Sequence, residues 1–130
     1  MKVLVADDDK ILLHLVSARL KASGWEVQTA VDAMQAFMMA LRGKPDVIVL
    51  DINMPGGKGT EALAKIRAST KTMMIPVLVV SGSIDPEDEA RMRKLGVAGY
   101  LAKPIDVDVL HQRLVEITQP TQPGAPGSDA

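Results

Sequence analysis

Short apolar runs bounded by polar residues divide this chain. They cover residues 3–6, 47–50, 77–80 and 101–102, the last preceded by Gly99 and Tyr100. Runs of this kind are typical of buried parallel strands that helices cover on both faces. A further stretch, 25–29, alternates apolar and polar residues, as an edge strand does. The pattern predicts five strands, at about 2–6, 25–29, 47–50, 77–80 and 97–102.

A segment with helical periodicity follows each predicted strand. The first helix is predicted at about 10–22, with Gly24 after its end. The second has an apolar stripe at Val31, Met34, Phe37, Met38 and Leu41 and stops before Pro45. The third is predicted at about 59–68. The fourth has Asp85 as its N-cap and Gly96 at its close, and the fifth runs from about 107 to 118.

Five alternations of strand and helix with right-handed crossovers predict an α/β fold. Its form is a three-layer, doubly wound (βα)5 sandwich around a five-stranded parallel sheet. We expect this domain to cover residues 1–118. The remaining segment, 119–130, is rich in proline and glycine and cannot bury a core. It is predicted to be a disordered tail or the stub of a linker.

Composition narrows the functional classes. A chain of 130 residues is most simply one domain, and its net charge of −1 gives no electrostatic footprint for nucleic acid or an anionic membrane. No apolar stretch approaches the length of about 18 residues that a membrane span needs. The absence of cysteine excludes thiol chemistry. We therefore expect neither a nucleic-acid nor a membrane partner, and a cytoplasmic location is the default.

Charged and hydroxyl side chains directly follow the predicted strands. Asp7, Asp8 and Asp9 follow the first, and Asp51, Ser81 and Lys103 follow the third, fourth and fifth. Ligands of parallel sheets bind outside the carboxyl ends of the strands, so these side chains are expected in one cleft. Adjacent carboxylates favour Mg²⁺, and an ammonium and a hydroxyl suit a phosphoryl group. Alternatively, Asp8 or Asp9 simply caps the first helix.

The order of these pieces resembles a known family. Asp51-Ile52-Asn53-Met54-Pro55 with Gly59, Ser81-Gly82, and Gly99-Tyr100-Leu101-Ala102-Lys103-Pro104 follow successive strands. Over residues 2–118 the chain resembles the receiver domain of two-component response regulators, in particular the single-domain chemotaxis type. The resemblance implies a flavodoxin-like strand order 2-1-3-4-5.

The resemblance also implies a chemistry. Asp51 would accept a phosphoryl group from a phosphohistidine of a sensor histidine kinase or a phosphotransfer protein, forming an acyl phosphate. Mg²⁺, with Mn²⁺ as a substitute, would be bound by Asp8, Asp51 and the backbone carbonyl of Asn53, and by Asp7 mainly through water. The chain would catalyse its own phosphorylation and dephosphorylation, without turnover of an external substrate.

The other family positions imply a switch. Lys103, joined to Pro104 by a cis peptide bond, and Ser81 would hold phosphoryl oxygens. Movement of Ser81 toward the phosphoryl group would let Tyr100 turn inward. The face made by the helix at 85–96, the strand at 97–102 and the helix at 107–118 would then change for a downstream protein target. The fourth helix has little apolar anchorage, mainly Ala90, Met92 and Leu95, as a movable element requires.

Several features leave alternatives open. The start at Met1 and the short tail favour a stand-alone domain over the N-terminal receiver of a longer DNA-binding or enzymatic regulator. A haloacid-dehalogenase-type phosphatase uses similar groups, but Asp51-Ile52-Asn53 lacks the second carboxylate that serves as general acid.

Three smaller expectations concern residues around the cleft. Gly82 stands where the family more often has alanine, which predicts a site open to small phosphodonors. The glycine-rich loop at 56–59 is predicted to be flexible, with Lys58 solvated. The methionines are predicted to be packing residues, namely Met34, Met38, Met39, Met73 and Met74.

Overall fold

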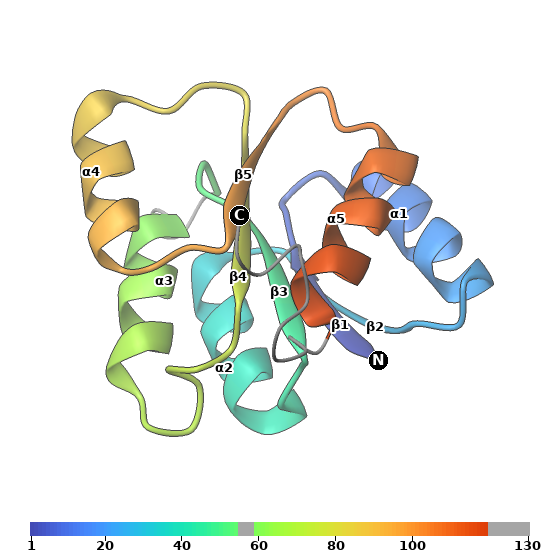
Figure 1. The fold of residues 1–130 in the computed structure, drawn as a ribbon, viewed down its shortest axis with the longest axis horizontal. Helices are drawn as coiled ribbons and strands as arrows, with labels where there is room; N and C mark the ends of the chain where they lie inside the picture. Colours follow the sequence, from blue (N-terminus) through green and yellow to red (C-terminus); the bar gives the residue numbers. More distant parts are fainter. Residues whose placement is uncertain (55–58, 120–130) are drawn as a thin grey trace, which may run out of the picture.

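A computed structural model describes residues 1–54 and 59–119 of this chain. Five strands alternate with five helices, as the sequence predicts (Figure 1). The strands are β1 (Lys2–Ala6), β2 (Glu26–Ala30), β3 (Val47–Asp51), β4 (Val77–Ser81) and β5 (Gly99–Ala102). The helices are α1 (Lys10–Ala22), α2 (Ala33–Gly43), α3 (Gly59–Ala68), α4 (Pro86–Lys94) and α5 (Val107–Thr118). The predicted flexibility of the loop at 56–58 and disorder of the tail at 120–130 concern positions outside the described residues.

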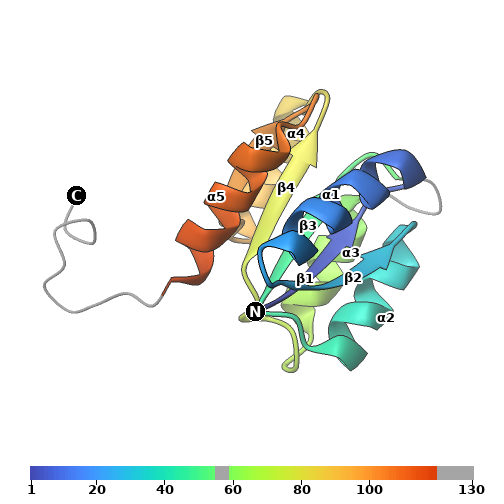
Figure 2. The ribbon, with the colours of Figure 1, turned by 90° about the vertical axis from the view of Figure 1, so that its right-hand side faces the viewer.

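All strand pairs in the sheet are parallel, and the strand order is β2-β1-β3-β4-β5. This confirms the predicted fold class and order. Figure 2 shows the strands running side by side, so their amino ends lie at one edge of the sheet and their carboxyl ends at the other. We call these the amino edge and the carboxyl edge. The carboxyl edge is where a parallel sheet presents its binding site.

Two hydrophobic cores lie on opposite faces of the sheet because successive strand residues point to opposite sides. One core joins Val3, Val5, Val47 and Val49 to the leucines of α1 and α5. The other joins Leu4, Ile48 and Leu50 to α2, α3 and Met92 of α4. Figure 1 shows α1 and α5 on one side of the sheet and α2, α3 and α4 on the other. Burial of both faces explains why these strands are continuously apolar.

The face of α2 differs from its predicted apolar stripe. The buried residues of the helix are Ala33, Ala36 and Ala40, whereas the side chain of Met34 is 68% exposed. Alanine has no bulk beyond Cβ, so the helix can lie close to the sheet. Size, rather than hydrophobicity alone, decides which side faces inward. The prediction that the methionines are packing residues is therefore wrong for Met34, and equally for the exposed Met73 and Met74.

The helix ends follow the predicted signals. Gly24 and Gly96 have positive φ angles of 88° and 73°, a conformation that glycine adopts at low cost. Asp85 accepts a hydrogen bond from the backbone N–H of Asp88. Met92 is fully buried in α4, but Ala90 is exposed and gives none of the anchorage predicted for it. Met92 is the buried side chain within α4, and the partly buried Leu95 at its C-cap also packs against the core, so the predicted weak anchorage is supported.

Candidate functional site at the carboxyl edge

The polar residues after the strands lie close together at the carboxyl edge. Asp51 and Ser81 are the last residues of β3 and β4, Asp7 directly follows β1, and Lys103 directly follows β5. The parallel register places these positions beside one another: Asp51 lies opposite Val80, and Ser81 opposite Ala102. The convergence predicted from the sequence is confirmed. It is a consequence of the strand order, because β1, β3, β4 and β5 are successive neighbours in the sheet.

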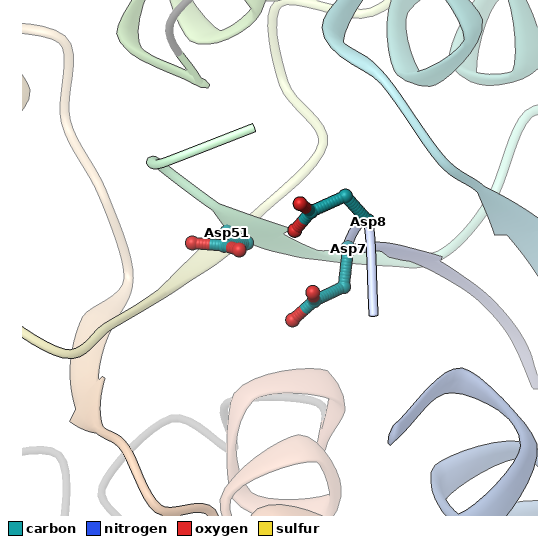
Figure 3. Close-up of side chains that lie close together, drawn as sticks. All are labelled: Asp7, Asp8 and Asp51. Carbon is teal, nitrogen blue, oxygen red and sulfur yellow. The ribbon is translucent and has the colours of Figure 1, made fainter. Parts of the chain in front are cut away.

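Three carboxylates form the acidic part of the site. One oxygen each from Asp7, Asp8 and Asp51 lies within 4.8 Å of the others. Figure 3 shows the side chains of Asp7 and Asp8 directed toward Asp51. Asp7 and Asp51 are buried, with 3% and 2% of their surfaces exposed, whereas Asp8 is exposed. Oxygen ligands at this separation, with one side open to solvent, fit a hard divalent cation such as Mg²⁺.

The third aspartate in the row has a different function. The carboxylate of Asp9 accepts hydrogen bonds from the backbone N–H groups of Ile11 and Leu12 and is the N-cap of α1. Its backbone N–H donates to Asp7 Oδ1 at 2.9 Å. The helix-capping interpretation is therefore confirmed for Asp9, and the metal-binding interpretation stays a prediction for the other two aspartates. Asp9 caps the helix, and Asp7 and Asp8 remain in the acidic cluster.

Lys103 bridges the two buried carboxylates. Its Nζ lies 3.1 Å from Asp7 Oδ2 and 3.1 Å from Asp51 Oδ2. Lys103 is joined to Pro104 by a cis peptide bond, as predicted. The backbone N–H of Lys103 donates to the carbonyl of Ser81 at 2.9 Å, which fixes the lysine next to the end of β4. An ammonium here can neutralise charge on Asp51 or on a group attached to it.

The pKa values of Asp7 and Lys103 are both raised, for different physical reasons. Burial raises the pKa of Asp7 above 3.8, and the hydrogen bonds from Asp9 and Lys103 only partly oppose this effect. For Lys103, burial lowers the pKa, but the hydrogen bonds to Asp51 and Asp7 outweigh it, so the pKa is raised above 10.5. At neutral pH the lysine stays charged, and the buried Asp7 holds its charge at a cost. A cation bound to Asp7 would remove that cost.

Ser81 is held by a local hydrogen-bond network. Its hydroxyl donates to the carbonyl of Ser83 at 2.6 Å and accepts from the backbone N–H of Ser83 at 3.1 Å. It also accepts from the side-chain amide of Asn53 at 3.1 Å. The backbone N–H of Asn53 donates to Asp51 Oδ1 at 3.0 Å, so Asn53 connects the carboxylate to the serine. The sequence did not predict this link, since it depends on two loops meeting.

Tyr100 lies partly buried on β5 and packs against the core that includes α2, α3 and Met92. Its hydroxyl is buried, and none of the described residues offers it a hydrogen-bond partner. A buried hydroxyl without a partner has an energetic cost. The position of Tyr100 on the strand next to Ser81 is consistent with the predicted pair, but the predicted movement of the two residues stays a prediction.

Two glycines, Gly59 and Gly82, flank the site, and they differ in the space that a side chain would find. A Cβ on Gly59 would clash with Ile52 Cα and would lie 2.5 Å from the carbonyl oxygen of Asp51, both backbone atoms. The start of α3 can therefore approach the end of β3 only without a side chain. A Cβ on Gly82 would meet nothing within 4 Å, so this side of the site is open. The importance of Gly59 lies in a tertiary contact that no local pattern reveals.

Comparisons with known proteins agree with this geometry. The family model described as the response regulator receiver domain matches residues 3–115. The chain is 35% identical over 118 residues to the response regulator PleD of Caulobacter vibrioides, covering 91% of this chain and 26% of that protein. It spans about a quarter to a half of the length of the curated relatives it matches.

Solved structures show the same architecture. The chemotaxis protein CheY4 of Vibrio cholerae matches with a TM-score of 0.82 and 32% identity, over 89% of this chain and 97% of that one. The receiver domain of the sensor histidine kinase PA1611 of Pseudomonas aeruginosa, solved with a magnesium ion in its active-site cleft, matches with a TM-score of 0.79 and 26% identity. This match covers 88% of this chain and 94% of that one. Within the described ranges, no helix is long and apolar enough to span a membrane.

Proposed function

The chain belongs to the response regulator receiver family of two-component signalling, and from this we propose how the site functions. Receiver domains are signalling switches that act through phosphorylation. The proposal is that Asp51 is the phosphoacceptor. The supporting observation is that Asp51, at the end of the central strand β3, combines a contact with Lys103 and a hydrogen bond from Asn53, whose side chain bonds to Ser81.

The proposed transfer needs positioning and charge neutralisation. A carboxylate oxygen of Asp51 attacks phosphorus, the phosphorus–nitrogen bond of a kinase phosphohistidine breaks, and the imidazole leaves with its electron pair. Lys103 then shifts from the carboxylates to the new phosphoryl oxygens. The side chain of Asn53 releases Ser81, whose hydroxyl donates to another of these oxygens. Water later hydrolyses the acyl phosphate, so the chain acts as its own phosphatase without turnover of an external ester.

Magnesium is the proposed cofactor, with Mn²⁺ as a substitute. Receiver domains bind Mg²⁺ in an acidic pocket, and here Asp7, Asp8 and Asp51 provide one. The magnesium ion named for the PA1611 receiver domain supports this assignment. In our proposal Asp8, Asp51 and the backbone carbonyl of Asn53 bind the ion directly, and Asp7 binds it through water. When bound, the ion neutralises charge that develops on the phosphoryl group.

The proposed readout is the face formed by α4, β5 and α5. The family interacts with histidine kinases and downstream effectors, and we propose that a protein target binds this face. Tyr100 on β5 would couple it to Ser81. The single buried side chain of α4 supports this choice, because a weakly anchored helix can shift at low cost. We propose a cytoplasmic site of action, where such kinases transfer phosphoryl groups.

Intact-mass analysis tests the phosphoacceptor. The full chain is incubated with acetyl phosphate and Mg²⁺, and we expect the mass of one phosphoryl group to be added, with none added to Asp51→Asn. Chelation of Mg²⁺ should abolish labelling of the wild type. Asp9→Asn is the matched control, because asparagine can still cap α1, and it should label like the wild type. An unlabelled wild-type chain, or labelling that persists in Asp51→Asn, would refute the assignment.

The haloacid-dehalogenase-type phosphatase is not proposed, because Asn53 provides an amide where that chemistry needs a carboxylate. Sustained release of phosphate from a simple phosphate ester by the same preparation would contradict this choice.

A further inference from the structure

A largely apolar groove lies at the amino edge of the sheet, at the opposite end from Asp51. Its volume is about 280 Å³. It is lined by Met1, the Ser23–Gly24 turn, Trp25, Val115, Thr118 and Gln119. The lining residues come from the start of β1, the connection between α1 and β2, and the end of α5. None of these side chains carries a charge, and Met1 adds the N-terminal ammonium, so the groove suits an apolar occupant without positive charge.

Trp25 provides a rigid wall for this groove. Only 8% of its surface is exposed, and its ring packs in the core beneath α1 and α5. The indole meets the ring of His111 edge to face, with centroids 6.5 Å apart. Its backbone N–H donates to the carbonyl of Leu20. A fixed indole beside a solvent-facing hollow is the kind of surface on which proline rings pack.

The described part of the chain ends at this groove. Gln119 follows α5, lines the groove, and has φ −67° and ψ 135°. These angles are those of a polyproline II helix. The next residue is Pro120, which disfavours helical angles for the residue before it. The last described residue therefore already has the conformation that a proline-rich segment would continue.

The sequence beyond Gln119 repeats proline at every third position, namely Pro120, Pro123 and Pro126. A polyproline II helix has three residues per turn, so these rings share one face, with successive rings about 9 Å apart. Asp129 is the only ionisable side chain in residues 120–130. As a polyproline II helix, the segment would thus present one regular, uncharged face of proline rings.

We propose that residues 120–126 of this chain bind in the groove as a polyproline II helix, with one proline ring against the exposed part of Trp25 and the next against the rest of the lining. Aromatic grooves recognise proline-rich segments because that helix is preformed and loses little entropy on binding. The tail is attached at the groove, which gives it a millimolar effective concentration, so a weak contact suffices. The proposal concerns the amino edge and does not depend on phosphorylation of Asp51.

The single tryptophan makes the contact measurable. Intrinsic fluorescence of the full chain is compared with that of a full-length variant carrying Pro120→Ala, Pro123→Ala and Pro126→Ala. We expect the wild type to emit at shorter wavelength and to be quenched measurably less by acrylamide, because the tethered tail covers the part of the indole that is exposed to solvent. Asp129→Asn should match the wild type. A tail of the same composition, with its prolines no longer three residues apart, should match the triple variant.

A second measurement identifies the occupant. Nuclear Overhauser contacts between the Trp25 indole and proline rings should be present in the full chain, with sedimentation showing a monomer. Equal quenching of the wild type and triple variant, or absent contacts, would overturn the proposal. Contacts that arise only in a dimer would show a second copy in the groove and would equally overturn the intramolecular form. Phosphoacceptor activity, unchanged in every variant, separates this outcome from a failure of the proposed function.

Discussion

At the amino edge of the sheet a charged side chain is surrounded by hydrogen-bond partners, whereas at the carboxyl edge charged side chains of like sign lie close together. At the amino edge, the guanidinium of Arg67 is held by the backbone carbonyls of Met73, Ile75, Leu95 and Gly96. At the carboxyl edge, three carboxylates crowd within 4.8 Å of one another, and Lys103 bridges two of them. Burial shifts the pKa of both Arg67 and Asp7 in the direction that disfavours the charged form.

The two edges differ in whether the protein itself provides the partners of the charged groups. The donors of Arg67 are satisfied within the protein and connect the loop before β4 to the end of α4, so their function is structural. The carboxylates have no comparable set of donors among the described residues, and a cation or phosphoryl group can complete them. Substitutions at the amino edge should therefore change stability and leave chemistry intact, and those at the carboxyl edge should separate stability from function.

The largest effect is expected at Gly59, because this residue is needed both for stability and for the position of Asp51. Gly59→Ala places a Cβ against the backbone of Ile52 and Asp51, so α3 or the end of β3 must shift. We expect a loss of about 3 kcal/mol in the free energy of unfolding, the upper part of the usual range for overpacking. The shift also displaces Asp51, so labelling by acetyl phosphate should fall. Urea unfolding and intact mass measure the two losses.

Gly24→Ala is a control for the loss of glycine as such, because its Cβ would meet nothing within 4 Å. Its positive φ makes it strained, and it should lower stability without lowering the phosphorylation rate of the folded protein. Full retention of both stability and labelling in Gly59→Ala would show that α3 can approach β3 differently from the structure described above.

Arg67 should have the next largest effect, on stability alone. Arg67→Met keeps the apolar stem but leaves four carbonyls without their donor, and we expect a loss of about 2 kcal/mol. Arg67→Lys should recover only part of it, since one ammonium cannot reproduce the planar set of donors. Thermal unfolding gives the ranking, and acetyl phosphate labelling should remain near the wild-type rate.

The exposed Lys65 on the same helix is the matched control, and Lys65→Met should change stability by less than about 0.5 kcal/mol. If Arg67→Met is as stable as Lys65→Met, the carbonyl contacts of Arg67 contribute nothing and the contrast between the edges disappears.

The sequence predicted one edge far better than the other. Strand ends are local features, so Asp51, Ser81 and Lys103 could be placed in one cleft as soon as the strands were ordered. Arg67 looks from its sequence like any basic residue in the last turn of a helix. Its four partners lie in two separate loops, and only the folded chain brings them together.

Size and close approach were the other features that the sequence left hidden. The apolar stripe predicted for α2 is wrong at Met34, which is exposed, whereas Phe37 packs against the core. The small residues Ala36 and Ala40, which lie closest to the sheet, are not marked by hydrophobicity alone. Gly59 was placed correctly as the start of α3, but its contact with the backbone of β3 is tertiary. Contacts between elements decide both cases, and no periodicity within one element records them.

Asp7 should show the trade between stability and function. Burial raises its pKa, so at neutral pH its charge destabilises the fold, and Asp7→Asn should raise Tm by about 3 °C in the absence of Mg²⁺. Mg²⁺ binding, followed by calorimetry, should weaken at least about tenfold, a typical cost of disturbing a metal site. A variant that loses stability would mean that the contact of Asp7 with Lys103 outweighs its burial.

The pH dependence of stability tests independently whether the charge of Asp7 destabilises the fold. Because the folded protein binds a proton on Asp7 more tightly than the unfolded chain does, wild-type stability should gain from acidification as the pH falls through the raised pKa toward 3.8. The Tm advantage of Asp7→Asn should therefore shrink at acidic pH. Asp9→Asn, at the exposed helix cap, should show no such advantage at any pH.

Gly82 should give the smallest effect and the cleanest separation of chemistry from stability. Its φ is not positive and a Cβ there meets no atom within 4 Å, so Gly82→Ala should be tolerated and should gain about 0.5 kcal/mol through the unfolded state. The new methyl group would narrow the open side of the site next to Ser81. We expect acetyl phosphate to label this variant a few times more slowly, with unchanged Mg²⁺ affinity. Faster labelling of the variant would mean that openness at Gly82 does not govern access, and that the rate is set by the carboxylates and Lys103.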